Sequence, residues 1–309
     1  MVDYLAITGG VGGAKLALGL AHILPADKVA FAVNTGDDFE HLGFAISPDI
    51  DTLTYTLSDL ANKELGWGRQ DETWAFMDAL ESLGGETWFR LGDKDLALHA
   101  YRTAELKAGR SLTEVTAAIC RKLGIQHTVL PMSDDPVRTT VLTAEGPLAF
   151  QHYFVRDRCA PAVSGFEFRG VEDACLNPDI EDLLPNLKGV IICPSNPFVS
   201  VDPLLSIGNT RAQLAELDAP VVAVSPIVGG TAIKGPTAKM MAELSIPSTA
   251  AAVAAHYDGL INGFVLDDQD ADLVSSLKVP STATQSVMLT LDDRISLAQA
   301  TLEFLNELR

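Results

Sequence analysis

The residues best suited to chemistry form two groups near the start of the chain. The first group follows the apolar stretch 5–7 and contains four glycines and a lysine: Gly9, Gly10, Gly12, Gly13 and Lys15. The second group has four aspartates within fifteen residues: Asp37, Asp38, Asp49 and Asp51. Glycines permit a sharp turn and a close backbone approach to a ligand, and a helix that begins there offers free N–H groups to a phosphate. Carboxylates can hold Mg²⁺, which usually keeps substrate phosphates among its ligands.

Each group also has a purely structural interpretation. A glycine turn can serve only the packing of a strand against a helix, and aspartates at a helix start can cap that helix. The glycine pattern is not a P-loop, because no Gly-Lys-Ser/Thr closes it, and it fits the spaced dinucleotide-binding pattern loosely. Four acids between two glycine-containing turns are more than capping needs. The sequence therefore favours a phosphate ligand and a bound metal or substrate, without identifying either.

The elements that must position these groups are buried parallel strands. Continuous apolar stretches occur at 5–7, 29–33, 190–193, 221–224 and 263–266, and loops rich in Gly, Ser, Pro or Asp follow them. Such stretches are typical of parallel strands, whose carboxyl ends meet at the edge where doubly wound folds bind ligands. We therefore predict a doubly wound α/β protein with a mainly parallel, Rossmann-like sheet. A C-terminal helix over 292–308 is expected to cover it.

Residues 151–188 differ in character from this parallel pattern. The segments 151–158 and 164–172 are short, aromatic-rich and charged at their ends, which predicts antiparallel strands. We assign 151–188 to a smaller antiparallel insertion, and 1–150 with 189–309 to a nucleotide-binding core. The segment 67–74, which contains Trp67, is expected to cap and pack a helix. His99 is expected to be a packed histidine rather than a ligand.

Composition narrows the classes of function. A net charge of −19 and a pI near 4.5 argue against nucleic acid as a partner. No apolar run approaches the length of a membrane span, and the N-terminus has no leader pattern, so we expect a cytoplasmic protein without a membrane partner. Four scattered cysteines argue against structural zinc and a disulfide framework. A small anionic substrate would need helix N-termini, basic side chains or a cation held by carboxylates.

Taken together, these motifs resemble the 2-phospho-L-lactate transferase family, which builds a deazaflavin redox coenzyme. The resemblance is carried, in order between residues 8 and 236, by GGVGGAKLALGL, VNTGDDFEHLGFAISPDIDTLTYTL, GWGRQDETW, LGDKDLALH, LPMSDDPVRT, PSNPFVSVDPLL and SPIVGGTAIKGP. The family transfers a phospho-carboxylic acid from a guanosine diphospho-linked donor to the terminal ribityl hydroxyl of a deazaflavin, Fo, and releases GMP. The acid is 2-phospholactate, phosphoenolpyruvate or 3-phosphoglycerate.

The resemblance implies roles for individual residues. The guanosine diphosphate would lie on the glycine turn with Lys15 and on the loops that contain Ser195, Asn196, Gly229 and Lys234. Asp49, with Asp37 or Asp38, would bind Mg²⁺. Fo would contact Asp51, Lys94, Asp95, Ser133 and Asp134. Asp49 and Asp51 would be the catalytic residues, with Asp51 as the hypothetical base. Lys94 stands where the family often has arginine. The lysine keeps the positive charge but loses the two-pronged hydrogen-bonding geometry of a guanidinium.

Other functions stay open at this stage. A non-catalytic nucleotide-sugar-binding regulator would share the glycine turn and the SPI loop but not the Fo-binding loops at GDKD and SDDP. A nicotinamide-dependent oxidoreductase is disfavoured by the glycine spacing. No serine or cysteine has a histidine at an interpretable spacing, so direct transfer fits the residues better than a covalent intermediate. We also expect a homodimer.

Overall fold

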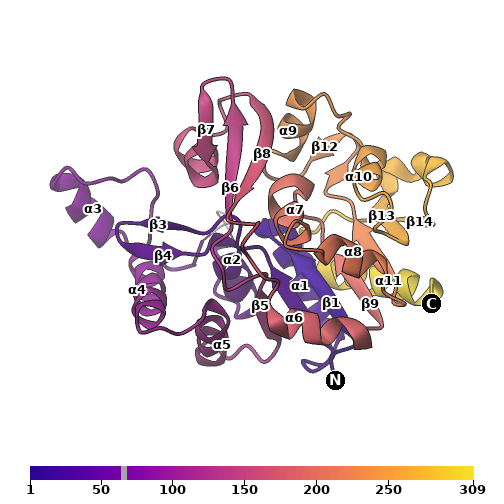
Figure 1. Cartoon of the computed structure of the whole chain (residues 1–309), viewed down its shortest axis with the longest axis horizontal. Coiled ribbons are helices and arrows are strands. Elements are labelled where there is room, and N and C mark those ends of the chain that lie inside the picture. Colours follow the sequence, from indigo (N-terminus) through magenta and orange to yellow (C-terminus); the bar gives the residue numbers. More distant parts are fainter. Residues whose placement is uncertain (64–67) are drawn as a thin grey trace.

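A seven-stranded parallel sheet with helices on both faces forms the centre of the computed structural model, which describes residues 1–63 and 68–309 (Figure 1). The strands are β1 (Tyr4–Thr8), β2 (Val29–Val33), β5 (Thr128–Pro131), β9 (Gly189–Ile192), β10 (Val221–Val224), β13 (Gly263–Asp267) and β14 (Ser281–Thr284). Their spatial order is β5-β2-β1-β9-β10-β13-β14. This is the Rossmann order with one strand added at the end. The prediction of a doubly wound, mainly parallel sheet is confirmed.

Two apolar cores, one on each face of the sheet, follow from the alternation of side chains along each strand. Leu5 and Ile7 of β1 belong to one core, whereas Tyr4 and Ala6 belong to the other. Helices α1 (Gly10–Ile23), α2 (Pro48–Leu57), α5 (Leu112–Lys122) and α11 (Leu291–Glu307) cover the Tyr4 face. Helices α6 (Pro178–Leu183), α7 (Asp202–Leu205), α8 (Thr210–Ala215), α9 (Thr237–Glu243) and α10 (Ala250–His256) cover the other. The C-terminal helix thus covers the sheet as expected.

Smaller elements extend from the carboxyl side of the sheet. They include the hairpins β3 (Phe39–His41) with β4 (Phe44–Ile46) and β11 (Ile227–Val228) with β12 (Thr231–Ala232), and helices α3 (Ala75–Ser82) and α4 (Asp93–Lys107). Three irregular helical turns are η2 (Leu184–Asn186), η3 (Pro197–Val201) and η4 (Asp268–Ser276). In Figure 1, β3, β4, α3 and α4 form an arm to one side of the sheet. Among the described residues, no helix has both the length and the apolar character needed to cross a membrane.

A three-stranded antiparallel sheet lies beside the main one, and it contains the strand expected over 164–172, which the structure places at Val163–Arg169. It is built from β6 (Arg138–Thr143), β7 (Gly146–Ala149) and β8 (Val163–Arg169). Two of these strands come from a segment that the sequence analysis placed in the core. The expected strand over 151–158 is wrong, because His152–Arg156 forms a π-helix, η1. A short aromatic run has no periodicity strong enough to separate strand from helix.

Candidate active site

A cavity of about 700 Å³ opens at the carboxyl edge of the main sheet, a size typical of small-molecule sites. Gly9, Gly10 and Gly12 line it from the β1–α1 turn, and Ser195 and Asn196 line it from the loop after β9. β1 and β9 are neighbours at the point where the strand order reverses. Ser195 joins the two loops, because its Oγ donates to Gly9 O at 2.9 Å. The predicted convergence of these loops is therefore present.

The glycines are required by close packing between these two loops. A methyl group on Gly12 would overlap the carbonyl oxygen of Pro194, and one on Gly13 would overlap the hydroxyls of Thr8 and Ser195. Gly13 supports the turn in this way without lining the cavity. The first residue of α1, Gly10, has a positive φ of 62°. The N-cap residue Gly9 makes no side-chain cap, and the Gly10 N–H is used by Asp49, so the N–H groups that can serve a ligand are those of the next residues in the first turn.

The four aspartates of the sequence motif are all buried near the N-terminus of α2. Asp37 and Asp38 follow β2, whereas Asp49 and Asp51 lie in the first turn of α2. Asp49 accepts hydrogen bonds from Gly10 N at 2.8 Å and from Asn34 Nδ2 at 2.9 Å. It thereby ties the phosphate-type turn to the end of β2.

Burial raises the pKa of three of these carboxyl groups, which disfavours their ionised form in the absence of a counter-charge. It raises the pKa of Asp38 to about 7 and that of Asp49 to about 6. The pKa of Asp37 is raised well above its ordinary value, first by burial and then by the nearby Asp49 and Asp38 carboxylates. Oδ1 of Asp37 and Oδ1 of Asp38 accept no hydrogen bond from the described residues. Asp37 and Asp49 line the cavity while Asp38 does not, so these two fit a divalent cation bound from the cavity side.

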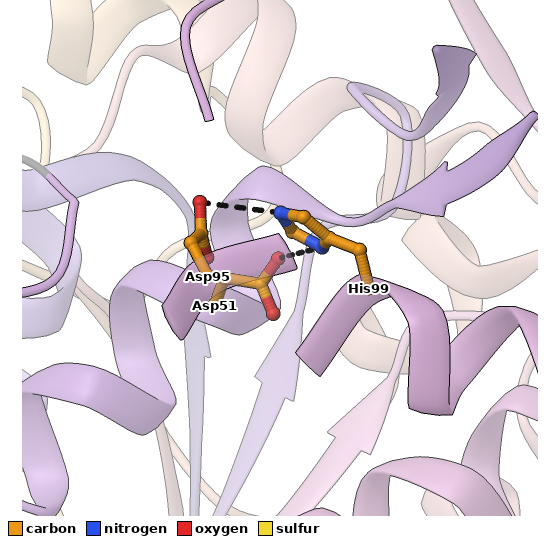
Figure 2. Close-up of side chains that lie close together, drawn as sticks. All are labelled: Asp51, Asp95 and His99. Carbon is orange, nitrogen blue, oxygen red and sulfur yellow. Dashed lines mark ion pairs between the residues drawn. The ribbon is translucent and has the colours of Figure 1, made fainter. Parts of the chain in front are cut away.

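The fourth aspartate, Asp51, belongs to a different cluster, shown in Figure 2. His99 of α4 lies between two carboxylates, with Nε2 at 3.2 Å from Asp95 Oδ2 and Nδ1 at 3.7 Å from Asp51 Oδ2. Arg102, also on α4, pairs with both oxygens of Asp51. Asp51, Asp95 and His99 line the cavity. Tyr55 completes the cluster, because its hydroxyl donates to Asp95 Oδ1 at 2.5 Å.

This second cluster is better explained as an ion-paired network than as a metal site. Within 1–63 and 68–309, Asp51, Asp95 and His99 form the one set of three acidic, His or Cys ligands whose atoms all lie within 4.8 Å of one another. Arg102 already supplies a fixed positive charge there and occupies both oxygens of Asp51. A cation at this point would be repelled by the guanidinium. Asp37 and Asp49 are therefore better suited than this cluster to hold a divalent cation.

An aromatic wall lines another part of the cavity, and the sequence analysis missed it. Trp88 and Phe89 come from the segment before α4, and Phe150 and Phe154 from the segment around η1. The Phe150 and Phe154 rings are stacked, with centroids 5.5 Å apart and planes 9° apart. The rings of Trp88 and Phe89 meet edge to face at 5.7 Å. The wall suits a flat, largely apolar group. Because the two pairs of residues lie about sixty positions apart in the sequence, no local sequence pattern predicts the aromatic wall.

Basic groups line the cavity beside the glycine turn. Lys15 and Lys234 both contribute to the lining, and Lys15 Nζ donates to Met288 O at 2.6 Å. Burial lowers the pKa of Lys15, and the charges of Arg294 and Lys234 lower it further. Neither lysine forms a salt bridge with another described residue, and basic side chains beside a helix N-terminus suit an anion.

Four other predicted residues do not line the cavity: Lys94, Ser133, Asp134 and Gly229. Ser133 Oγ donates to Cys175 O at 2.6 Å, and Asp134 accepts from the backbone of Thr113 at 2.7 Å. The Lys94 side chain is exposed, and Gly229 N donates to Asp270 at 2.9 Å. Trp67, expected to pack a helix, lies outside the described residues.

Fold and site together define a class: a doubly wound α/β protein with a deep ligand cavity at its topological switch point. A family model described as 2-phospho-L-lactate transferase CofD matches residues 5–304. The chain belongs to this family, whose members are phospho-acid transferases of deazaflavin coenzyme biosynthesis.

Individual relatives agree with this assignment. A phosphoenolpyruvate transferase of Streptomyces griseus subsp. griseus is 37% identical over 312 residues, which is 98% of each chain. A 2-phospho-L-lactate transferase of Methanosarcina mazei is 37% identical over 263 residues, 85% of this chain and 86% of its own. A solved Bacillus halodurans protein of the upf0052 family has a TM-score of 0.66 at 14% identity and covers 98% of this chain and 100% of its own. That last likeness concerns the fold alone.

Proposed function

We propose that this protein transfers a phospho-carboxylic acid from a guanosine diphospho-linked donor to the ribityl hydroxyl of Fo, with Mg²⁺ as cofactor and GMP as the second product. The observation that carries the proposal is that one cavity joins a phosphate-type glycine turn, a buried pair of carboxylates and an aromatic wall. A donor and an acceptor that react directly must share one cavity in this way.

Two sets of cavity-lining residues suit the two substrates. The diphosphate would lie against the β1–α1 turn, Ser195 and Lys15, where N–H groups and positive charge converge. The tricyclic ring of Fo would lie on the aromatic wall, and its ribityl chain would extend towards Asp51 and Asp95. In this arrangement Ser133, Asp134 and Gly229 are left out of direct substrate binding, because they do not line the cavity.

The chemistry needs charge neutralisation more than a strong base. Attack of an alcohol on a phosphoanhydride develops negative charge on the phosphate oxygens, and positioning with electrostatic stabilisation provides most of the catalysis. When bound, Mg²⁺ supplies that neutralisation. Asp37 and Asp49 would hold it, and Asp51 would orient the acceptor hydroxyl. Direct transfer accounts for the residues present without a covalent nucleophile.

The proposal is tested by product formation. The protein is incubated with Fo, GTP, Mg²⁺ and a guanylyltransferase, with 2-phospholactate, phosphoenolpyruvate or 3-phosphoglycerate in separate reactions. Mass spectrometry should show one Fo adduct whose mass identifies the acid, and the adduct should vanish with EDTA. If Fo fluorescence shows no binding and no reaction gives an adduct, the transferase proposal is wrong. A nucleotide-sugar-binding regulator would then fit the same fold better.

A further inference from the structure

Arg102 is a charged side chain that is fully buried, which packing alone does not explain. Its side chain has 0% exposure and is the largest fully buried side chain in the described chain. It lies behind the cavity lining rather than in it. Burying a guanidinium is costly unless its donors are used. Here Nη1 and Nη2 reach Asp51, His99 and the Ala45 carbonyl, whereas Nε has no hydrogen-bond partner among the described residues.

The guanidinium fixes the orientation of the Asp51 carboxylate. Nη1 donates to Asp51 Oδ2 at 3.2 Å, and Nη2 donates to Asp51 Oδ1. A two-pronged contact of this kind prevents rotation of the carboxylate, whereas a lysine would bind as a point charge and leave it free to turn. The Asp51 side chain is 8% exposed and belongs to the cavity lining, so its small exposed part faces the cavity.

The same guanidinium also determines which ring nitrogen of His99 carries the proton. Arg102 Nη1 lies 3.2 Å from His99 Nδ1. Because a guanidinium can only donate, Nδ1 must accept, and Nε2 carries the ring proton. Nε2 lies 3.2 Å from Asp95 Oδ2, a close polar contact without the geometry of a hydrogen bond. Asp51 and Asp95 are therefore linked through Arg102 and His99 into one chain of contacts.

We propose that Arg102 is a positioning residue that acts through Asp51 and, by way of His99, through Asp95, so that both carboxylates present a fixed geometry to the attacking hydroxyl. The inference rests on the proposed acceptor site. It assigns Arg102 neither a contact with substrate nor a contact with the metal. Its role is to keep two cavity carboxylates in register across α2 and α4.

The test is Arg102→Lys in the full-length protein, which keeps the charge but loses the fork. We expect kcat to fall by about 100-fold, as a misplacement of about 1 Å can cause, with the melting temperature, the Kd for GDP and the Kd for Mg²⁺ near those of the wild type. Arg102→Ala should regain activity when guanidinium is added at millimolar concentration, and methylammonium should restore less. Arg110→Lys, which alters the half-exposed Arg110–Glu105 pair, is the matched control and should leave kcat unchanged.

The outcomes separate this inference from the proposed function. If the wild type neither binds Fo nor transfers an acid to it, the proposed function fails. If the wild type is active and folded Arg102→Lys keeps its full kcat, only the positioning role fails. Should the Arg102 variants not fold, His99→Leu tests the same chain of contacts, because leucine has neither an acceptor for Arg102 nor a donor for Asp95. A reduced kcat with unchanged GDP binding supports the role, and an unchanged kcat overturns it.

Discussion

At the scale of single residues, the buried carboxylates differ in what surrounds them. Asp51 is paired with Arg102, Asp49 accepts from a backbone amide and an asparagine, and Asp37 keeps one oxygen without a described partner. Asp38 accepts a hydrogen bond from Ser47 Oγ at 2.7 Å and does not belong to the cavity lining. These partners explain why acids close in sequence are proposed to have separate roles.

The first prediction compares two of these acids. Asp49→Asn should lower kcat/KM by on the order of 100-fold or more, because metal-bound charge stabilisation contributes several kcal/mol and each ~1.4 kcal/mol is tenfold. It should also weaken Mg²⁺ binding in titration calorimetry of the protein with GDP. Asp38→Asn is the control and should keep most of the Mg²⁺ affinity. Equal Mg²⁺ affinity in the wild type and Asp49→Asn would contradict the assignment of the metal ligands.

The raised pKa of Asp38 predicts how stability depends on pH in the magnesium-free protein. The folded pKa of about 7 lies above the ordinary 3.8, so the folded state holds a proton that the unfolded chain releases. The stabilisation is fully present below about pH 4 and is lost as the pH rises through about 7. The wild type should therefore melt at a lower temperature at pH 8 than at pH 5. Asp38→Asn should reduce that difference, by on the order of 5 °C in scanning calorimetry; an unchanged difference would refute it.

Part of the site could be predicted from residue types, and part could not. The glycine turn and the Asp37, Asp49 and Asp51 positions follow from local motifs, and the structure brings them to one cavity. Arg102 was missed as a functional residue. The available signal was helical spacing, since Asp95, His99 and Arg102 stand at i, i+4 and i+7 on one face of α4. Its partner Asp51 lies on another helix, so the pairing depends on tertiary packing.

At the scale of elements, the close contact between α1 and the loop after β9 constrains the site. Gly12→Ala would place a methyl group onto Pro194 O, a backbone atom that cannot rotate away. We expect destabilisation of roughly 1–3 kcal/mol, as overpacking typically costs, and a clear loss of GDP affinity. Gly165→Ala is the control, because its added methyl would meet only Leu142 at 3.4 Å. Wild-type GDP affinity in Gly12→Ala would show that the turn does not hold the nucleotide.

The aromatic wall gives a prediction specific to the acceptor. Phe154 lines the cavity and is 39% exposed. Phe154→Ala should raise the Kd for Fo by about tenfold, since stacking of a base on an aromatic ring contributes about 1–3 kcal/mol, with GDP binding unchanged. Phe76→Ala is a matched control, because Phe76 on α3 is 40% exposed and lies outside the cavity lining. Equal Fo affinity in both variants would place the ring elsewhere.

Strands and turns differ in how far the sequence reveals them. The continuous apolar runs of β1, β2, β9, β10 and β13 are buried along their full length, which is why their character was evident. The aromatic segment 151–158 predicts a strand, but within it His152–Arg156 forms η1. There the packing of Tyr153, which is fully buried, overrides a weak local pattern.

At the scale of the whole molecule, the proposed function requires a protein of net charge −19 to bind a diphosphate. The cavity lining contains four basic side chains, Lys15, Arg90, Arg158 and Lys234, beside the carboxylates of Asp37, Asp49, Asp51 and Asp95. A helix N-terminus and a divalent cation would add to the basic side chains. Neutralisation is therefore local and does not depend on the overall charge. A homodimer stays a prediction, which sedimentation can measure.

The most direct measurement is a crystal structure of the protein with GDP, Mg²⁺ and Fo. The account predicts the diphosphate against the β1–α1 turn and Ser195, the metal on Asp37 and Asp49, and the Fo ring on Phe150 and Phe154, with its terminal hydroxyl near Asp51. GDP and Fo in separate sites, or the metal bound away from Asp37 and Asp49, would contradict it.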